Sequence, residues 1–221
     1  MRLPFRPFAV IFDMDGLLFD TEALYQESIV AAGENEGCEM TPAIFQRMVG
    51  RPWDRNRTFL LEHYGPDFPV DDFRAAWLRQ FDLRVATRLA LKPGAVELLD
   101  MLDELHLPRA IATSSSHQNV RHHLEAHNLV GRFREIVAHG DYASGKPAPD
   151  PFLKAAERLG VEPRFCLALE DSHNGIRSAS AAGMLTIMVP DLVEPTDEIR
   201  DLCSFVVPDL HAVCRLVGAT K

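Results

Sequence analysis

Four carboxylates stand at the ends of two apolar runs in this sequence. Asp13 and Asp15 follow one run and precede Gly16, whereas Glu170 and Asp171 end another. Mg²⁺ prefers oxygen ligands and binds through a few carboxylates while it keeps some of its water. A phosphate dianion repels a carboxylate nucleophile, and a divalent cation that bridges the two removes this barrier. The four acids therefore predict chemistry on a phosphorylated substrate, with Mg²⁺ as the cofactor.

Hydroxyl groups and a lysine accompany these acids. Thr113 and Ser114 follow a third apolar run, and Lys146 lies in a loop with Pro147 and Pro149. A helix N-terminus with free N–H groups and a nearby hydroxyl is a ready phosphate site. Lys146 would place positive charge on phosphoryl oxygens, and the two prolines stiffen its loop. Each of these residues alone is weak evidence for a phosphate site, because such residues are also common in turns, in helix caps and at the surface.

The apolar runs are short and continuous, which is typical of strands buried on both faces of a parallel sheet. A weak run covers residues 135–138, and the clear ones are 8–12, 109–112, 166–169, 185–189 and 204–207. The helical patterns between them include 94–106, 117–128, 150–159 and 173–182. This alternation predicts a doubly wound, Rossmann-like α/β core with a parallel sheet. Ligands of such sheets bind beyond the carboxyl ends of the strands, where all the residues above would meet.

The stretch from residue 21 to residue 90 breaks this alternation. It holds no convincing strand, and its prolines separate four amphipathic helical patterns, 22–32, 41–49, 57–64 and 71–87. The simplest interpretation is an α-helical cap domain, residues 21–90, inserted into an α/β core domain of residues 1–20 and 91–221. Trp53 and Trp77 in the insert favour core packing of the cap, with a substrate-contacting wall as the alternative.

Taken in order, these motifs resemble those of the haloacid dehalogenase superfamily. The stretches that are similar to its β-phosphoglucomutase-like branch are Phe12-Asp13-Met14-Asp15-Gly16-Leu17-Leu18, Gly145-Lys146-Pro147-Ala148-Pro149-Asp150 and Leu169-Glu170-Asp171-Ser172. The resemblance covers both core segments and the placement of a helical cap after the first strand. It implies a Mg²⁺-dependent phosphatase that hydrolyses a small phosphomonoester, either a sugar phosphate or a nucleoside-type phosphate, through an aspartyl-phosphate.

The resemblance and the chemistry together give each residue an expected role. Asp13 would be the nucleophile, and Asp15 would protonate the leaving oxygen and then deprotonate the attacking water. Lys146 would be catalytic and would also bind the substrate phosphate, together with Thr113 and Ser114. The metal ligands would be Asp13, Asp15 through its backbone carbonyl, Glu170 and Asp171.

A phosphosugar mutase of the β-phosphoglucomutase type is the alternative function. Those mutases carry a cap histidine twelve residues after the nucleophile, where this chain has Tyr25, and a Ser-Arg-containing cap loop, where it has Gly50-Arg51-Pro52-Trp53. A domain that only binds phosphorylated metabolites would lack at least one catalytic group. This sequence has the whole expected set, namely Asp13, Asp15, Lys146 and Asp171. A true dehalogenase would have no use for the Glu170–Asp171 pair.

Two groups of basic side chains each admit two interpretations. Arg51, Arg55 and Arg57 of the insert fit a solvated face, with a contact to the substrate's phosphate or polar groups as the alternative. A predicted helix carries His122, His123 and His127. His123 and His127 are four residues apart, but no carboxylate completes a zinc-protease pattern, so we expect a solvated or capping role for all three.

The composition is that of an ordinary soluble protein, because 47% of the 221 residues are hydrophobic and 25% are charged. The net charge of −9 and the lack of a Lys/Arg run exclude a general nucleic-acid binder. The N-terminal apolar run is cut short by Asp13, and no stretch approaches the ~20 apolar residues of a membrane span. We therefore expect a cytoplasmic monomer whose partner is a small phosphorylated metabolite and neither nucleic acid nor a membrane.

Overall fold

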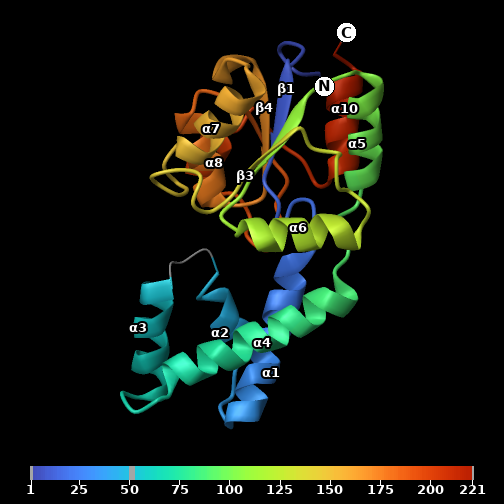
Figure 1. Cartoon of the computed structure of the whole chain (residues 1–221). Coiled ribbons are helices and arrows are strands. Elements are labelled where there is room, and N and C mark those ends of the chain that lie inside the picture. The colour runs from blue at the N-terminus through green and yellow to red at the C-terminus, as the bar shows by residue number, and fades with distance from the viewer. Residues whose placement is uncertain (1, 50–52, 221) are drawn as a thin grey trace. The chain divides into compact units, whose positions relative to one another are not determined.

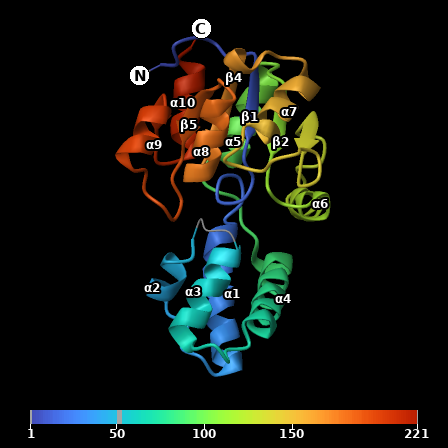
Figure 2. The ribbon, with the colours of Figure 1, turned by 90° about the vertical axis from the view of Figure 1, so that its left-hand side faces the viewer.

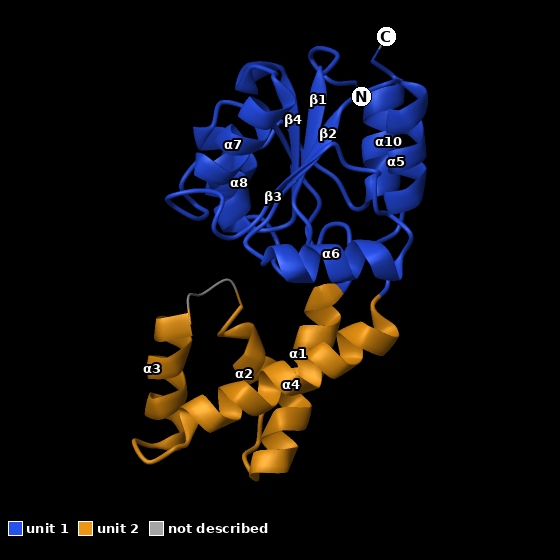
Figure 3. Ribbon diagram, in the orientation of Figure 1, with its two compact units in different colours: residues 1–20, 90–221 blue, residues 21–89 orange. Residues whose placement is uncertain are grey.

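The chain divides into two compact units, which are coloured separately in Figure 3. One unit contains residues 1–20 and 90–221, and the other contains residues 21–89. The structure, a computed structural model, describes residues 2–49 and 53–220. Across this described part, no helix combines the length and the apolar character that a membrane span needs.

The larger unit is built on a six-stranded sheet in the order β3-β2-β1-β4-β5-β6 (Figure 1). All neighbouring strands are parallel. The strands are β1 (Ala9–Phe12), β2 (Arg109–Ala112), β3 (Glu135–Val137), β4 (Cys166–Glu170), β5 (Leu185–Met188) and β6 (Phe205–Val206). The predicted doubly wound α/β sheet is therefore confirmed, including the strand that the sequence indicates only weakly.

Helices cover both faces of this sheet, which explains why its strands are continuously apolar. Every residue of β1 and β4 is buried. The helices α7 (Asp150–Leu159) and α8 (His173–Ala181) pack on one face. The paired helices α5 (Ala95–Glu104) and α10 (Leu210–Gly218) lie on the opposite face (Figure 1).

Three further elements belong to this unit. Helix α6 (His117–Ala126) lies across the edge formed by the carboxyl ends of the strands (Figure 1). Helix α9 (Asp197–Leu202) packs on α8, and a 3₁₀ turn, η1 (Pro163–Phe165), leads into β4. Helix α6 thus lies at the edge where ligands of such sheets bind.

The strand register brings the ends of three strands level with one another. Phe12, the last residue of β1, is paired with Ile111 of β2 and with Leu169 of β4. The chain order reverses between β1 and β4, because β2 and β3 follow on one side and β5 and β6 on the other. Ligands of open α/β sheets bind at such a switch point. The residues after Phe12 and Leu169 are Asp13 and Glu170, so the register places two of the predicted site residues there.

The smaller unit consists of helices in its described residues, namely α1 (Thr21–Glu36), α2 (Pro42–Gln46), α3 (Trp53–Tyr64) and α4 (Val70–Arg88). Helices α1 and α4 lie side by side (Figure 2). An apolar cluster that includes Ile29, Phe45, Phe73 and Trp77 fills its interior. The predicted packing role of Trp77 is confirmed, since the residue is only 3% exposed.

Candidate active site

A buried lysine–carboxylate cluster lies at the switch point between β1 and β4. The ammonium group of Lys146 donates hydrogen bonds to Asp13 Oδ1 and, over 2.6 Å, to Glu170 Oε1. Asp13 is 7% exposed and Glu170 is 1% exposed. Burial alone would lower the pKa of Lys146, but the carboxylates of Asp13 and Glu170 raise it above its usual value. Lys146 is therefore a fixed positive charge beside Asp13.

The single positive charge of Lys146 does not neutralise the acidic side chains around it. One carboxylate oxygen each from Asp13, Glu170 and Asp171 lies within 4.8 Å of the other two. Burial, with help from Glu170 and Asp15, raises the pKa of Asp13 to about 8, although Lys146 opposes the shift. The raised pKa of Asp13 shows that the site lacks positive charge, and oxygen ligands at this spacing suit a hard divalent cation. The residues thus fit Mg²⁺.

Two close approaches of the backbone shape this acidic cluster. Gly16 has φ +80°, and a Cβ at this position would overlap the Asp171 carboxylate. Gly175, in α8, lies so close to Glu170 that a Cβ there would overlap the Glu170 carboxylate. Glu170 Oε2 also accepts hydrogen bonds from the backbone N–H of Ser172 (2.7 Å) and from its hydroxyl (2.9 Å). The Glu170 side chain is therefore fixed by Lys146, by Ser172 and by the close backbone of Gly175.

Asp15 faces two side chains from the segment that leads into and forms α6. Its Oδ2 accepts a hydrogen bond from the Ser115 hydroxyl over 2.7 Å. Its Oδ1 lies 3.9 Å from Nδ1 of His123, whose ring packs against Phe19. His123 is 3% exposed, and burial lowers the pKa of its imidazole. The solvated or capping role expected for His123 is therefore wrong, because α6 turns this side chain inwards.

The structure places the predicted phosphate-binding pair at the same edge but in different environments. Thr113 is 1% exposed, and its hydroxyl accepts a hydrogen bond from the backbone N–H of Ser115 over 3.1 Å. Ser114 is exposed. Tyr142 donates its hydroxyl hydrogen to the carbonyl oxygen of Thr113 over 3.1 Å. Thr113 thus shapes the turn, whereas Ser114 faces solvent.

Sequence reasoning missed four residues that hold this site, namely Ser115, His123, Ser172 and Gly175. Ser172 follows the acidic pair directly, and its N-cap position on α8 is a signal that the sequence offers. The contact between His123 and Asp15 offers no such signal, because it joins residues from distant elements.

Two of the three arginines named above, Arg55 and Arg57, lie among the described residues. Arg57 forms an ion pair with Asp71 over 3.5 Å, and both side chains are largely exposed. Arg55 is exposed, and Arg51 lies outside the residues that the structure describes. The solvated-face interpretation is consistent with both described members of the group.

The sequence matches the family model of the haloacid dehalogenase-like hydrolases over residues 10–189. A relative from Drosophila melanogaster, named "Probable pseudouridine-5'-phosphatase", is 37% identical over 188 residues, covering 82% of this chain and 80% of that protein. The phosphorylated carbohydrates phosphatase of Thermotoga maritima is 31% identical over 176 residues, covering 80% of this chain and 82% of that protein.

A solved structure agrees with these sequence matches. The crystal structure of CbbY from Rhodobacter sphaeroides in complex with phosphate superimposes with a TM-score of 0.75 and 25% identity, covering 92% of this chain and 95% of that chain. The aligned part of the chain is long enough to include residues of both compact units. The family match includes the cluster around Asp13 and Glu170. The chain therefore belongs to the haloacid dehalogenase-like hydrolases and is a phosphoric monoester hydrolase of that family.

Proposed function

We propose that the protein is a Mg²⁺-dependent phosphatase that hydrolyses a small phosphomonoester through an aspartyl-phosphate on Asp13. The observation that supports this most is the buried Asp13 carboxylate, which is paired with Lys146 within a cluster of acids that fits a divalent cation. The core domain, residues 1–20 and 91–221, would carry the chemistry, and the helical cap domain, residues 21–90, would select the substrate.

In the first half of the reaction, a carboxylate oxygen of Asp13 attacks phosphorus and the ester oxygen leaves. Asp15 gives its proton to that leaving oxygen, so that an alcohol departs in place of an alkoxide. Lys146 and the segment Thr113–Ser114 hold the phosphoryl oxygens and offset their charge. Lys146 also keeps Asp13 in place through its bond to Glu170.

In the second half, water attacks the aspartyl-phosphate and regenerates Asp13. Asp15 is now a carboxylate and takes the proton of that water, so one group serves first as an acid and then as a base. Asp13, Glu170, Asp171 and the backbone carbonyl of Asp15 would hold Mg²⁺, which would supply positive charge that offsets the repulsion between the nucleophile and the phosphate dianion.

The substrate class follows from the relatives. One of them is named for pseudouridine 5′-phosphate and another for phosphorylated carbohydrates. Both names describe a phosphate ester of a small hydroxylated metabolite, so we assign a sugar phosphate or a nucleoside-type phosphate to this chain.

The test is phosphate release from a panel of phosphosugars and nucleoside monophosphates, measured with Mg²⁺ and with EDTA. We expect release from at least one ester, and we expect EDTA to abolish it. Conversion of a phosphosugar into its isomer without net phosphate release would instead identify a mutase and overturn the proposal. Binding of phosphate esters without any turnover by metal-replete protein would identify a non-enzymatic domain.

Replacement of Asp15 by asparagine should lower kcat by about 10²–10⁴-fold, because an amide neither protonates the leaving oxygen nor accepts a proton from water. Acetyl phosphate has a leaving group that needs no proton, so it should still phosphorylate this variant. The aspartyl-phosphate should then accumulate and be visible by mass spectrometry of the intact protein. Rapid turnover of acetyl phosphate without such accumulation would contradict the role of Asp15 in the second half.

Metal binding should strengthen as the pH rises. Folding raises the pKa of Asp13 from 3.8 to about 8, so the native state holds more protons than the unfolded chain in this window and loses stability as the pH increases through it. Mg²⁺ competes with that proton. The increase in Tm caused by Mg²⁺ should therefore be larger at pH 8 than at pH 5.5, and Asp171→Asn should reduce it. An equal increase at both pH values would contradict this electrostatic account.

A further inference from the structure

Tyr142 lies behind the turn that follows β2, with its hydroxyl group against two residues of that turn. It belongs to the loop between β3 and α7, four residues before Lys146. Its hydroxyl donates to the carbonyl oxygen of Thr113 over 3.1 Å and also shares a hydrogen bond with the side chain of Ser114. The phenol therefore contacts a residue expected to hold the phosphoryl group, although the reaction proposed above uses no tyrosine.

The Tyr142 ring is fixed within the larger unit. It is half-buried and packs against an apolar cluster that includes Phe152. The backbone of Gly145 runs beside the ring, because a Cβ at that position would lie 3.7 Å from Tyr142 Cε2. The preceding residue, Asp141, accepts a hydrogen bond from Arg158 over 3.1 Å. A phenol held by such packing is in place for a ligand without rearrangement of the ring.

The Tyr142 phenol keeps its proton and directs it away from Ser114. Burial raises the pKa of Tyr142 above its usual value, whereas the Ser114 hydroxyl and the Lys146 ammonium oppose the shift. A neutral phenol has one proton to donate and lone pairs that accept. Since this proton goes to the Thr113 carbonyl oxygen, the second bond runs from the Ser114 hydroxyl to the phenol oxygen.

A bound phosphoryl group would reverse the direction of this second bond. The phosphoryl oxygens accept hydrogen bonds, so Ser114 has to turn its only proton towards them. The Ser114 oxygen can then accept, and the Tyr142 phenol is beside it and able to donate. Rotation of the two hydroxyl groups is sufficient, and no heavy atom has to move. The phenol gives up a neutral bond to Thr113 and joins a chain that ends on an anion, where hydrogen bonds are stronger and polarise one another.

We propose that Tyr142 is a positioning residue for phosphoryl binding, which accepts from the Ser114 hydroxyl in the free protein and donates to it once Ser114 binds a phosphoryl oxygen. The proposal rests on the proposed function, in which Ser114 binds the phosphoryl group, and it adds a residue that does not itself contact the substrate. The two hydroxyl groups act as a pair, so the phenol influences phosphate binding only through Ser114.

The test is a double-mutant cycle in which the full chain, saturated with Mg²⁺, is titrated with inorganic phosphate by calorimetry. Ser114→Ala should weaken phosphate binding by about tenfold or more, because it removes a hydrogen bond to a charged group. Tyr142→Phe should weaken it by about threefold to tenfold. Adding Tyr142→Phe to Ser114→Ala should cause no further loss. Additive losses would show that Tyr142 only supports the turn, and they would overturn the proposal.

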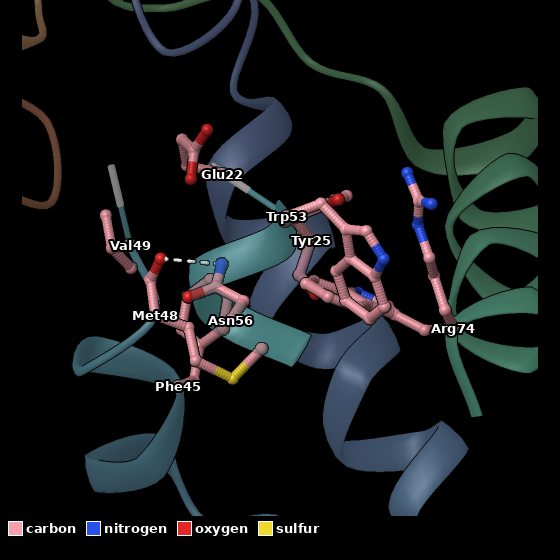
Figure 4. Close-up of a pocket in the computed structure, with 9 residues that line it drawn as sticks. Glu22, Tyr25, Phe45, Met48, Val49, Trp53, Asn56 and Arg74 are labelled. Atoms are coloured by element: carbon pink, nitrogen blue, oxygen red, sulfur yellow. Dashed lines mark hydrogen bonds between the residues drawn. The ribbon is translucent and has the colours of Figure 1, made fainter. Parts of the chain in front are cut away.

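Tyr64 provides the matched control for the loss of a phenol hydroxyl. The chain has three tyrosines, and two of them belong to the helical unit. Tyr25 lines a cavity of that unit among other aromatic rings, so it is not a neutral site for substitution (Figure 4). The Tyr64 hydroxyl donates to the carbonyl oxygen of Glu39 over 2.6 Å, which is also a bond from a phenol to a backbone carbonyl. Tyr64→Phe should bind phosphate as the parent does, and a loss equal to that of Tyr142→Phe would contradict the proposal.

Failure of this proposal can be told apart from failure of the proposed function. Phosphate release by the parent, together with independent effects of the Ser114 and Tyr142 substitutions, would remove the role of Tyr142 and leave the phosphatase intact. Phosphate binding with the expected coupling, in a protein that releases phosphate from no ester, would retain the hydroxyl pair and remove the enzymatic function.

Discussion

Asp13→Asn is expected to lower phosphate release by about 10⁴-fold or more, with the protein still folded. The amide has the size of the carboxylate but is a poor nucleophile, and loss of an attacking group typically removes nearly all turnover. The substitution also removes one negative charge from a cluster in which Asp13 resists ionisation. In EDTA above about pH 8 the variant should therefore be at least as stable as the parent.

The matched control for this variant is Asp67→Asn, because Asp67 is exposed and belongs to the helical unit. The control should keep the rate and the Tm of the parent. Phosphate release would be followed with the best ester of the panel, and Tm by calorimetry with and without Mg²⁺. If Asp13→Asn kept more than about a tenth of the parent's kcat, Asp13 would not be the nucleophile and another acid of the cluster would have to be tested.

The strands of the core were predictable because burial on both faces of the sheet requires a continuous run of apolar residues, which is visible in the local sequence. Residues 9–12 and 166–170 are uninterrupted by exposed positions, and a parallel sheet between two helical layers imposes that pattern. The strand order, β3-β2-β1-β4-β5-β6, leaves no such trace, since it depends on pairing between distant segments. Helix α3 begins at Trp53, four residues before the predicted start, and helix ends are where a periodic pattern gives the weakest signal.

The candidate site was predictable to the extent that its residues follow strands. Asp13 and Glu170 come directly after paired residues of β1 and β4, so the sheet brings them together. Lys146 lies in a loop that the sequence already placed at this sheet edge, with its charge directed at Asp13, but its second bond, to Glu170, was not predicted. The inward turn of His123 depends on which face of α6 meets which neighbour, and a single sequence does not specify that pairing.

Gly175→Ala should reverse the usual effect of this substitution in a helix. Alanine normally stabilises a helix by about 1 kcal/mol relative to glycine. At this position the new Cβ would overlap the Glu170 carboxylate, which therefore has to move. That movement breaks the hydrogen bonds from Ser172 and from Lys146 and leaves buried charges unpaired. We expect a loss of about 1–3 kcal/mol in the free energy of unfolding, as overpacking typically costs.

The same substitution should lower kcat by about 10²-fold or more, because Lys146 loses the partner that aligns it with Asp13. Gly218→Ala is the control, since a Cβ there meets its nearest neighbour, Met101, at an ordinary 3.6 Å. A double-mutant cycle with Glu170→Ala shows whether the loss of kcat is caused by displacement of Glu170. If it is, adding Gly175→Ala to Glu170→Ala should cause little further loss of rate. Fully additive losses would show that Gly175 acts on the site independently of this carboxylate.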